Sequence, residues 1–198
     1  MSPPIKVVHV ETPRPTTYSA AGVRIDDESG LPIVRVMKAI RPQVYESKAM
    51  EKAFEIGQEA HRQIERKIGN NGTEKEYVVW AYWPDFVLEA HLDLYNAKQG
   101  VVLEIKSWPY FVNEHQACVL QLSAYAALVD AKTAFFVLYQ GDFQTTINSE
   151  KTKTERKFRV TSFSQAWVPL MPKDQILDYL EAKARELFTK LRAEGKLQ

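Results

Sequence analysis

The fold is decided by the stretch Phe86–Ser107, FVLEAHLDLYNAKQGVVLEIKS. Two runs of apolar and β-branched residues, Phe86–Tyr95 and Val101–Ser107, flank the polar, glycine-ended segment Asn96–Gly100. Strand-like runs joined by three to five residues that include glycine are typical of an antiparallel hairpin. The stretch therefore predicts a hairpin inside a larger sheet.

Alternation along these strands sorts their side chains onto two faces, because successive residues point to opposite sides of a sheet. One face is expected to be apolar and to belong to the core: Leu88, Ala90, Leu92, Leu94, Val101, Leu103 and Ile105. The other face is expected to concentrate ionisable side chains: Glu89, His91, Asp93, Glu104 and Lys106.

The turn sets two of these carboxylates against each other. With the turn centred near residues 98–99, Asp93 lies opposite Glu104, and opposed Cβ atoms are about 4.5–5.5 Å apart. Two carboxylates at that distance repel each other, and a hard divalent cation such as Mg²⁺ or Mn²⁺ removes the repulsion. Lys106 adds an ammonium group on the same face. Such a set can activate water and stabilise the charge that develops in phosphodiester hydrolysis.

Two points stay open beside this prediction. The cluster is also compatible with an ordinary cross-strand group of surface charges. Asp85, in the literal Trp83-Pro84-Asp85 sequence, also precedes Glu104. We read Asp85 as a turn or strand-entry residue, because it is too far along the hairpin to oppose Glu104.

Length and composition set the frame. A chain of 198 residues most naturally forms one domain, and a net charge of +1 means that a nucleic acid would have to be held by local patches. The single cysteine, Cys118, excludes an internal disulfide and a four-cysteine iron–sulphur cluster within one chain. No apolar run approaches the roughly 20 residues that span a bilayer, and the N-terminus lacks a signal-peptide core. We therefore expect a cytoplasmic protein with no membrane partner.

The order of the expected elements predicts the fold class. Residues 1–45 are expected to form an irregular, proline-rich arm packed on the domain, and residues 46–198 a single domain. An α/β fold follows, with a central mixed sheet flanked by helices. The elements expected after the arm are a helix over 46–68, three strands, a helix capped at Asn113 and reaching about Asp130, strands Thr133–Gln140 and Lys153–Phe163 around a polar loop, and a last helix from Pro172 or Asp174.

Several groups outside the hairpin have two open interpretations. The arm either packs over the domain or closes over a substrate with Arg14, Arg24, Arg35, Lys38 and Arg41. Charged groups that either line a cleft or form a solvated surface are Lys48, Lys52, Arg62, Arg66 and Lys67, with the segment Lys151–Arg159. Trp108, Tyr110 and Phe111 either stack on unpaired bases or cap the sheet.

Two further motifs extend the pattern. Gly57-Gln58-Glu59-Ala60-His61 lies on the first long helix, and Gln121-Leu122-Ser123-Ala124-Tyr125 lies on the second. Together with Asp93 and Glu104-Ile105-Lys106, they resemble the PD-(D/E)XK nuclease superfamily and its RecB-like branch, which has a restriction-endonuclease-like core. The resemblance covers about a third of the chain. Ala90 departs from the glycine that the branch usually has three residues before the aspartate.

This resemblance implies roles that spacing alone does not give. It implies that His61 and the carbonyl of Ile105 join Asp93 and Glu104 as ligands of Mg²⁺ or Mn²⁺. It also implies that Gln121 orients the lysine or DNA and that Tyr125 contacts the phosphate side. Glu65, one turn after His61, either orients its imidazole or approaches the metal. A hydrogen-bonded core histidine and a half-buried amide and phenol are the alternatives from the residues themselves.

The expected function is hydrolysis of DNA, with single strands or ends favoured, by an exonuclease or a single-strand-acting endonuclease. The cysteines of the CRISPR-associated exonucleases are missing, so the resemblance favours a viral or phage-type member without an iron–sulphur cluster. A homo-oligomer is possible. The alternative is a non-catalytic nucleic-acid-binding or assembly subunit that keeps a nuclease fold.

Overall fold

The structure is a computed structural model that describes residues 4, 6–10, 14–19, 22–41, 48–68, 73–147 and 154–197. Within these ranges, nothing is described of the side chains at 48–52, 54, 146, 147 and 154–156. Among the charged groups that were expected to line a cleft or a solvated surface, the side chains of Lys48, Lys52 and Lys151–Arg156 therefore lie outside the described residues.

A mixed sheet of seven strands forms the centre of the fold, which confirms the expected α/β class. Its order is β1-β5-β6-β7-β8-β9, with β4 paired to β6 in parallel and β7 to β8 in parallel. The bounds of these strands are β1 Lys6–His9, β4 Ile33–Arg35, β5 Glu74–Tyr82, β6 Val87–Asn96, β7 Val101–Ser107, β8 Thr133–Ile147 and β9 Thr154–Ala166.

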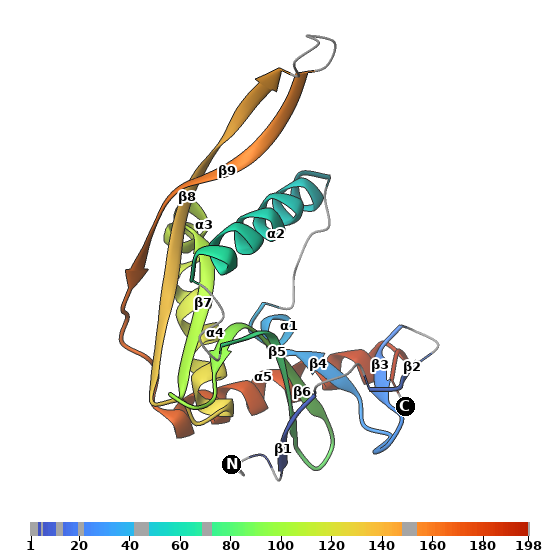
Figure 1. Cartoon of the computed structure of the whole chain (residues 1–198). Helices are drawn as coiled ribbons and strands as arrows, with labels where there is room; N and C mark the ends of the chain where they lie inside the picture. Colours follow the sequence, from blue (N-terminus) through green and yellow to red (C-terminus); the bar gives the residue numbers. More distant parts are fainter. Residues whose placement is uncertain are drawn as a thin grey trace.

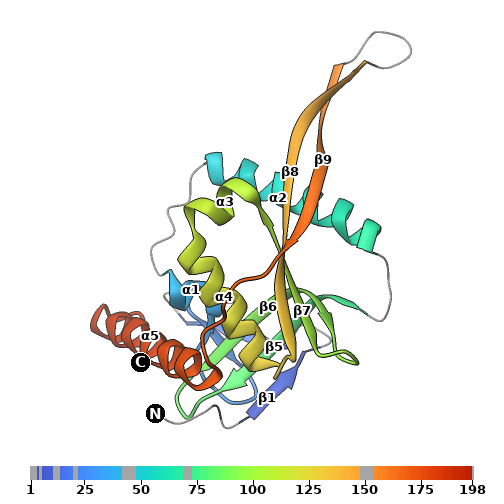
Figure 2. The ribbon, with the colours of Figure 1, turned by 90° about the vertical axis from the view of Figure 1, so that its left-hand side faces the viewer.

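Helices cover both faces of this sheet (Figures 1 and 2). On one face, buried residues of α4 and α5 pack with Leu88, Ala90 and Leu92 of β6. On the other face, Ala60 and Ile64 of α2 pack with β7 and β8. The helices are α1 Val36–Ile40, α2 Lys48–Ile68, α3 Trp108–Asn113, α4 His115–Leu128 and α5 Lys173–Ala193.

The segment expected as an irregular arm carries regular structure. Strand β1 pairs with β5, β4 pairs with β6, and β2 (Thr16–Tyr18) with β3 (Arg24–Asp26) forms a small separate sheet. The neighbouring strands β5 and β6 offer free edges, and short segments between prolines can pair there even where their own sequence signal is weak. The N-terminal segment is thus built into the central sheet.

The hairpin β6–β7 has the expected register, but its faces differ from the expectation. Leu94 pairs with Leu103, so the next step along both strands brings Asp93 to Glu104. Leu94, however, packs under α2, whereas Leu92 packs under α4 and α5.

The prediction that Leu88 to Leu94 share one apolar face is therefore wrong at Leu94. The alternation shifts near Asp93. Leu92 and Leu94 pair with residues of β5, and Asp93 between them lies opposite Glu76, whose φ is 50°. The expectation of one apolar and one charged face is wrong as well, because buried apolar clusters cover both sides of β7.

Strands β8 and β9 continue well past the body of the protein as a two-stranded hairpin (Figures 1 and 2). A polar loop was expected directly after Gln140, but β8 runs on to Ile147 and pairs with β9 throughout. The register shifts between Gln140 and Gly141, and a Cβ at Gly141 would lie 2.3 Å from the Phe158 ring. The close strand approach at this bend requires glycine.

Helix α2 crosses the outer strand of this hairpin. Gln63 donates from Nε2 to the Phe158 carbonyl at 2.9 Å and accepts from the Val160 amide at 3.0 Å. Strand β9 is the last strand in the sheet, and the Gln63 side chain forms its hydrogen bonds with backbone groups on the outer edge of β9.

The described helices contain no segment long and apolar enough to span a membrane.

Candidate active site

Glu104 lies at the centre of a buried polar group between β7 and α4. Lys106 donates from Nζ to Glu104 Oε1 at 2.5 Å, and Gln121 donates from Nε2 to the same oxygen at 2.7 Å. Gln121 also donates to the Tyr125 hydroxyl at 2.9 Å. Residues four apart share one face of a helix, which is why α4 presents Gln121 and Tyr125 to the same strand.

Burial controls the protonation of this group. Burial and, to a smaller extent, the Asp93 carboxylate raise the pKa of Glu104, and with the opposing effect of Lys106 included this pKa is about 8. Burial acts to lower the pKa of Lys106, but the charges of Glu104 and Asp93 outweigh it and hold that pKa above its usual value. The lysine is therefore a fixed cation, while the carboxyl of Glu104 is poised near neutral pH.

Asp93 joins β6, β7 and α2 at one point. Its Oδ2 accepts from the backbone amide of Ile105 at 2.7 Å, and its Oδ1 lies 3.6 Å from Nδ1 of His61. The structure thus brings His61, from a distant helix, to the acids of the hairpin. The half-buried position of His61 distinguishes it from Ile64, which is fully buried on the same helix.

The depth of these side chains differs in a way that suits a reaction centre. Glu104 is 1% exposed, whereas Lys106, Asp93 and His61 are between 17% and 29% exposed. A substrate would meet Asp93, Lys106 and His61 first, with Glu104 beneath them.

The donor atoms fit a hard divalent cation. Glu104 Oε2 is buried without a hydrogen-bond partner, which is costly unless another group binds it. The backbone pairing of β6 and β7 ends at Leu94–Leu103, so Ile105 turns its N–H, and with it the carbonyl of the same residue, toward Asp93. Among the described residues, no three His, Cys, Asp or Glu side chains lie together as a metal-binding group, so His61, Asp93 and Glu104 are not a ready-made set of three ligands in this structure. Mg²⁺ is commonly bound by one or two carboxylates, with water and substrate oxygens completing its shell.

Three expected roles take a different form. Glu65 faces Lys75 at 3.5 Å rather than His61. Tyr125 is buried, with its hydroxyl held by Gln121, so it lies beneath the site rather than at a phosphate-facing surface. Gln121 contacts Glu104 instead of the lysine, because the face of α4 that carries Gln121 and Tyr125 packs under β7.

Two other sequence readings can be placed. Asp85 lies in the bend before β6 and forms an ion pair with Arg185 of α5 at 2.5 Å, so it has a structural role away from Glu104. Asn113 does not cap α4: it ends α3, and the residue before α4 is Glu114, whose side chain makes no capping bond. The expected cap failed because the chain is already helical before that helix begins.

The arginines of the N-terminal segment are held by ion pairs. Arg24 and Arg35 both bind Glu89, which is buried and also accepts from Trp80 Nε1 at 2.9 Å. Burial opposes ionisation of Glu89, yet its hydrogen bonds with His91, Arg24 and Trp80 keep its pKa far below the usual range. Sequence reasoning placed Glu89 in the charged cluster of the hairpin, but the structure shows that it anchors the N-terminal strands.

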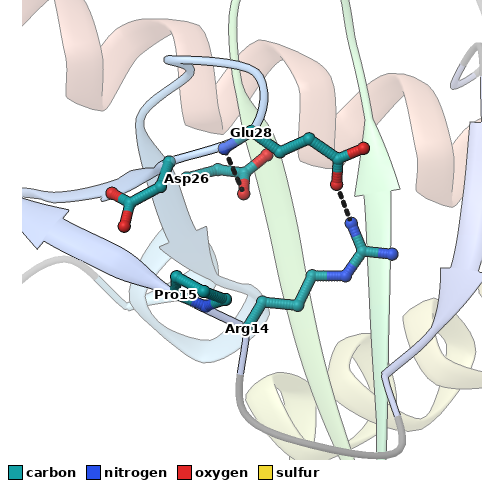
Figure 3. A pocket seen from close by; sticks show the side chains of 5 residues that line it. Arg14, Pro15, Asp26 and Glu28 are labelled. Atoms are coloured by element: carbon teal, nitrogen blue, oxygen red, sulfur yellow. Dashed lines mark hydrogen bonds and ion pairs between the residues drawn. The ribbon is translucent and has the colours of Figure 1, made fainter.

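Two hollows lie under that segment, and neither is lined by Asp93 of β6 or Glu104 of β7. One, of about 370 Å³, is lined by Arg14, Pro15 and three acids (Figure 3). There Arg14 reaches across to Glu28 at 2.7 Å, and the Asp26 carboxylate accepts from Ser29. These groups satisfy one another, so this hollow is a structural junction. The other, of about 390 Å³, is lined by Val10, Arg14, Thr16, Tyr18, Arg24, Glu76, Val78, Trp80, Glu89 and His91.

Exposed cations lie on the elements beside the candidate site. Arg66 and Lys67 are exposed on α2, and Lys157 and Arg159 on β9. The ammonium of Lys67 lies 5.6 Å from the centre of the Phe163 ring, which ties α2 to the hairpin. Arg62, the other expected cleft residue with a described side chain, is exposed as well and forms an ion pair with Glu59 at 3.0 Å.

No family model and no curated protein matches this sequence. Among solved structures, a chain in the crystal structure of SSO0001 is similar, with a TM-score of 0.46 and 16% sequence identity. The alignment covers 77% of this chain and 75% of that one.

Proposed function

We propose that the chain is a metal-dependent nuclease that hydrolyses DNA phosphodiester bonds, as its sequence resemblance to the RecB-like PD-(D/E)XK nucleases implies. The observation that carries the proposal is the convergence of Asp93, Glu104 and Lys106, with His61 beside them, at one half-exposed point. The unpartnered buried oxygen Glu104 Oε2 is compatible with a cation at this point, although Asp85 Oδ1 and Glu181 Oε2, which belong to ion pairs with Arg185, are buried and unpartnered as well.

In this proposal the residues have different roles in hydrolysis, which follow from their depth and charge. A bound Mg²⁺ or Mn²⁺ would be held by Asp93, Glu104, the Ile105 carbonyl and His61, and it would supply an activated water and charge neutralisation. Lys106 stays protonated and directs its positive charge to the phosphate oxygens, where negative charge grows in the transition state. Gln121 and Tyr125 keep the Glu104 carboxylate in place from below.

A cleavage assay with matched variants tests this proposal. End-labelled DNA is incubated with the full chain in Mg²⁺ or Mn²⁺, and the products are compared for Asp93→Asn, Glu104→Gln and Lys106→Met. These replacements preserve side-chain size in the buried group. Each is expected to lower the rate at least about a hundredfold, because each removes a group that stabilises charge in the transition state.

Asp85→Asn is the control for the acid set. Asp85 also precedes Glu104 in the sequence, but it pairs with Arg185 on the surface of α5. The Asp85→Asn protein is expected to cleave DNA at the parent rate. Full activity in any of the three site variants, or a parent protein that binds DNA and cleaves nothing in Mn²⁺, would refute the assignment; the second result would favour a non-catalytic binding subunit.

A further inference from the structure

Strand β9 has an open edge beside the body of the protein. It is the last strand of the central sheet, and among the described strands it pairs only with β8 (Figure 1). An antiparallel strand directs its backbone N–H and C=O groups to both sides, so the sheet does not use the outer groups of β9. Gln63 of α2 binds two of them, at Phe158 and Val160, and its hydrogen bonds end there.

The part of this edge that Gln63 leaves uncovered is short and regular. The pairing of β9 with β8 is interrupted by one extra residue, Thr161, and is regular again from Ser162 to the end of β9 at Ala166. Residues 161–165 are all exposed. Residues 162–166 therefore form a straight, solvent-facing strand segment to which a further strand can be added.

The sequence of this segment lacks most of the features that keep an open edge from pairing. Residues 160–168 read VTSFSQAWV, with no charged residue and no proline. Natural proteins commonly protect an open edge with lysine, proline, an inward-pointing charge or a bulge. The extra residue Thr161 is such a bulge, but it lies outside the five regular residues.

The two faces of the segment differ in the size of their side chains. On the face covered by α2, Phe163 is 40% exposed beneath the ammonium of Lys67, and Trp167 is 62% exposed with its ring centre 4.7 Å from that of Phe135. The opposite face carries small side chains: Ser162, Ser164 and Ala166. A neighbouring strand can therefore approach closely on one face and cover apolar rings on the other.

We propose that residues 162–166 form the contact between two copies of this chain, which pair antiparallel about a twofold axis at Ser164 and join their sheets into one. Ser164 is the middle residue, so only this register pairs all five residues of both copies. Phe163 then lies opposite Gln165 of the second copy and diagonal to its Phe163, within reach of an aromatic ring. This interface goes beyond the proposed nuclease function and does not depend on it.

Charge and symmetry favour a second copy over an unrelated strand. Interfaces with a particular foreign partner commonly use charges matched to that partner, and residues 160–168 carry none. In a twofold pair, each residue meets a residue of the same neutral segment, so no like charges of the strands face each other. The nearest cations of β9, Lys157 and Arg159, fall outside the paired segment. Twofold dimers are also the commonest assemblies, because one surface serves both subunits.

Paired charge variants test the interface and its register together. Sedimentation velocity of the full chain at high micromolar concentration is expected to show twice the mass of one chain. Ser164→Lys places two like charges opposite each other at the axis and should weaken the dimer at least about tenfold. Ser164→Glu should do the same, and an equimolar mixture of the two variants should restore the dimer, because opposite charges then meet.

Thr161→Lys is the matched control for these variants. It adds the same charge to an exposed position of the same strand, but in the proposed register it lies roughly 20 Å from the same residue of the second copy. It is expected to dimerise as the parent does.

Cysteine variants give a readout that does not depend on affinity. Cys118 is buried, so an introduced cysteine is the exposed thiol. Ser164→Cys is expected to form a disulfide between two chains under mild oxidation, because directly opposed residues of antiparallel strands have Cα atoms about 4.5–5.5 Å apart. Thr161→Cys should not, because a disulfide does not bridge Cα atoms more than about 7 Å apart. A non-reducing gel separates the two results.

The outcomes decide the proposal in either direction. A monomeric parent, a Ser164→Lys protein that dimerises as the parent does, or equal cross-linking of the two cysteine variants would each overturn it. Circular dichroism of each variant should match the parent, since both positions are exposed. If a charge variant does not fold, the cysteine pair still decides. The nuclease assignment is tested separately, by the cleavage assay.

Discussion

Replacing Glu104 with glutamine is expected to remove a large part of the pH dependence of stability in the metal-free protein. Burial, with the charge of Asp93, raises the pKa of Glu104 from 4.5 to about 8. Between these two values the folded state holds a proton that the unfolded state releases. The free energy of unfolding must therefore fall as pH rises through this window.

The size of the effect follows from linkage. Within the window the contribution of Glu104 falls by about 1.4 kcal/mol for each pH unit, so the parent should lose about 3 kcal/mol between about pH 5 and about pH 7 from this group. Glutamine does not ionise, yet it offers an oxygen to Lys106 and Gln121. If the Glu104→Gln substitution has a cost in stability that does not depend on pH, it shifts the variant's curve of unfolding free energy against pH vertically and leaves the shape of that curve unchanged.

The measurement is urea unfolding in EDTA, followed by circular dichroism over a series of pH values. Other titrating groups are shared by both proteins, so they cancel when the two curves are subtracted. The variant should gain stability relative to the parent as pH rises through the window. Parallel curves would show that Glu104 titrates near its usual value, and the reasoning from its burial would be refuted.

Two further predictions concern the other buried acid and the metal. Glu89→Gln is expected to lower the free energy of unfolding by about 2–4 kcal/mol at neutral pH, because it leaves two arginines without a full counter-charge. Because contacts lower the pKa of Glu89 in the folded state, its contribution is fully present above the unfolded value of 4.5 and is lost progressively as pH falls toward the folded value. The difference between the two urea curves should therefore begin to shrink below about pH 4 and keep shrinking as the solution becomes more acidic. Saturating Mn²⁺ should raise the Tm of the parent by stabilising the folded state, and Asp93→Asn should reduce this rise; equal rises in both proteins in a thermal scan would contradict ligation by Asp93.

Local patterns predicted the parts of the site that lie on one hairpin. The Asn96–Gly100 turn fixed the register, and with it the approach of Asp93 to Glu104. The final helix also begins where the sequence places it, between Pro172 and Asp174, and its apolar residues Ile176 and Leu180 are buried.

Contacts between segments that are distant in the sequence could not be predicted from such local patterns. The change of face at Leu94 depends on an irregularity opposite Glu76, and strand alternation gives no sign of it. From its helical spacing alone His61 was expected to be a core histidine, and the ligand role came from the resemblance; only the packing of α2 against the sheet decides where its ring lies. The polar sequence after Gln140 resembles a loop because both faces of a projecting strand meet water.

The Gln63 amide on the edge of β9 has a consequence for solubility. The last strand of a sheet offers unpaired N–H and C=O groups, and such an edge can recruit strands from other molecules into aggregates. By occupying the Phe158 carbonyl and the Val160 amide, Gln63 shields the edge where the hairpin leaves the body. His61 stands two residues earlier on the same helix. A molecule in which α2 swings away would thus lose the histidine of the candidate site and expose a template for self-association at the same moment.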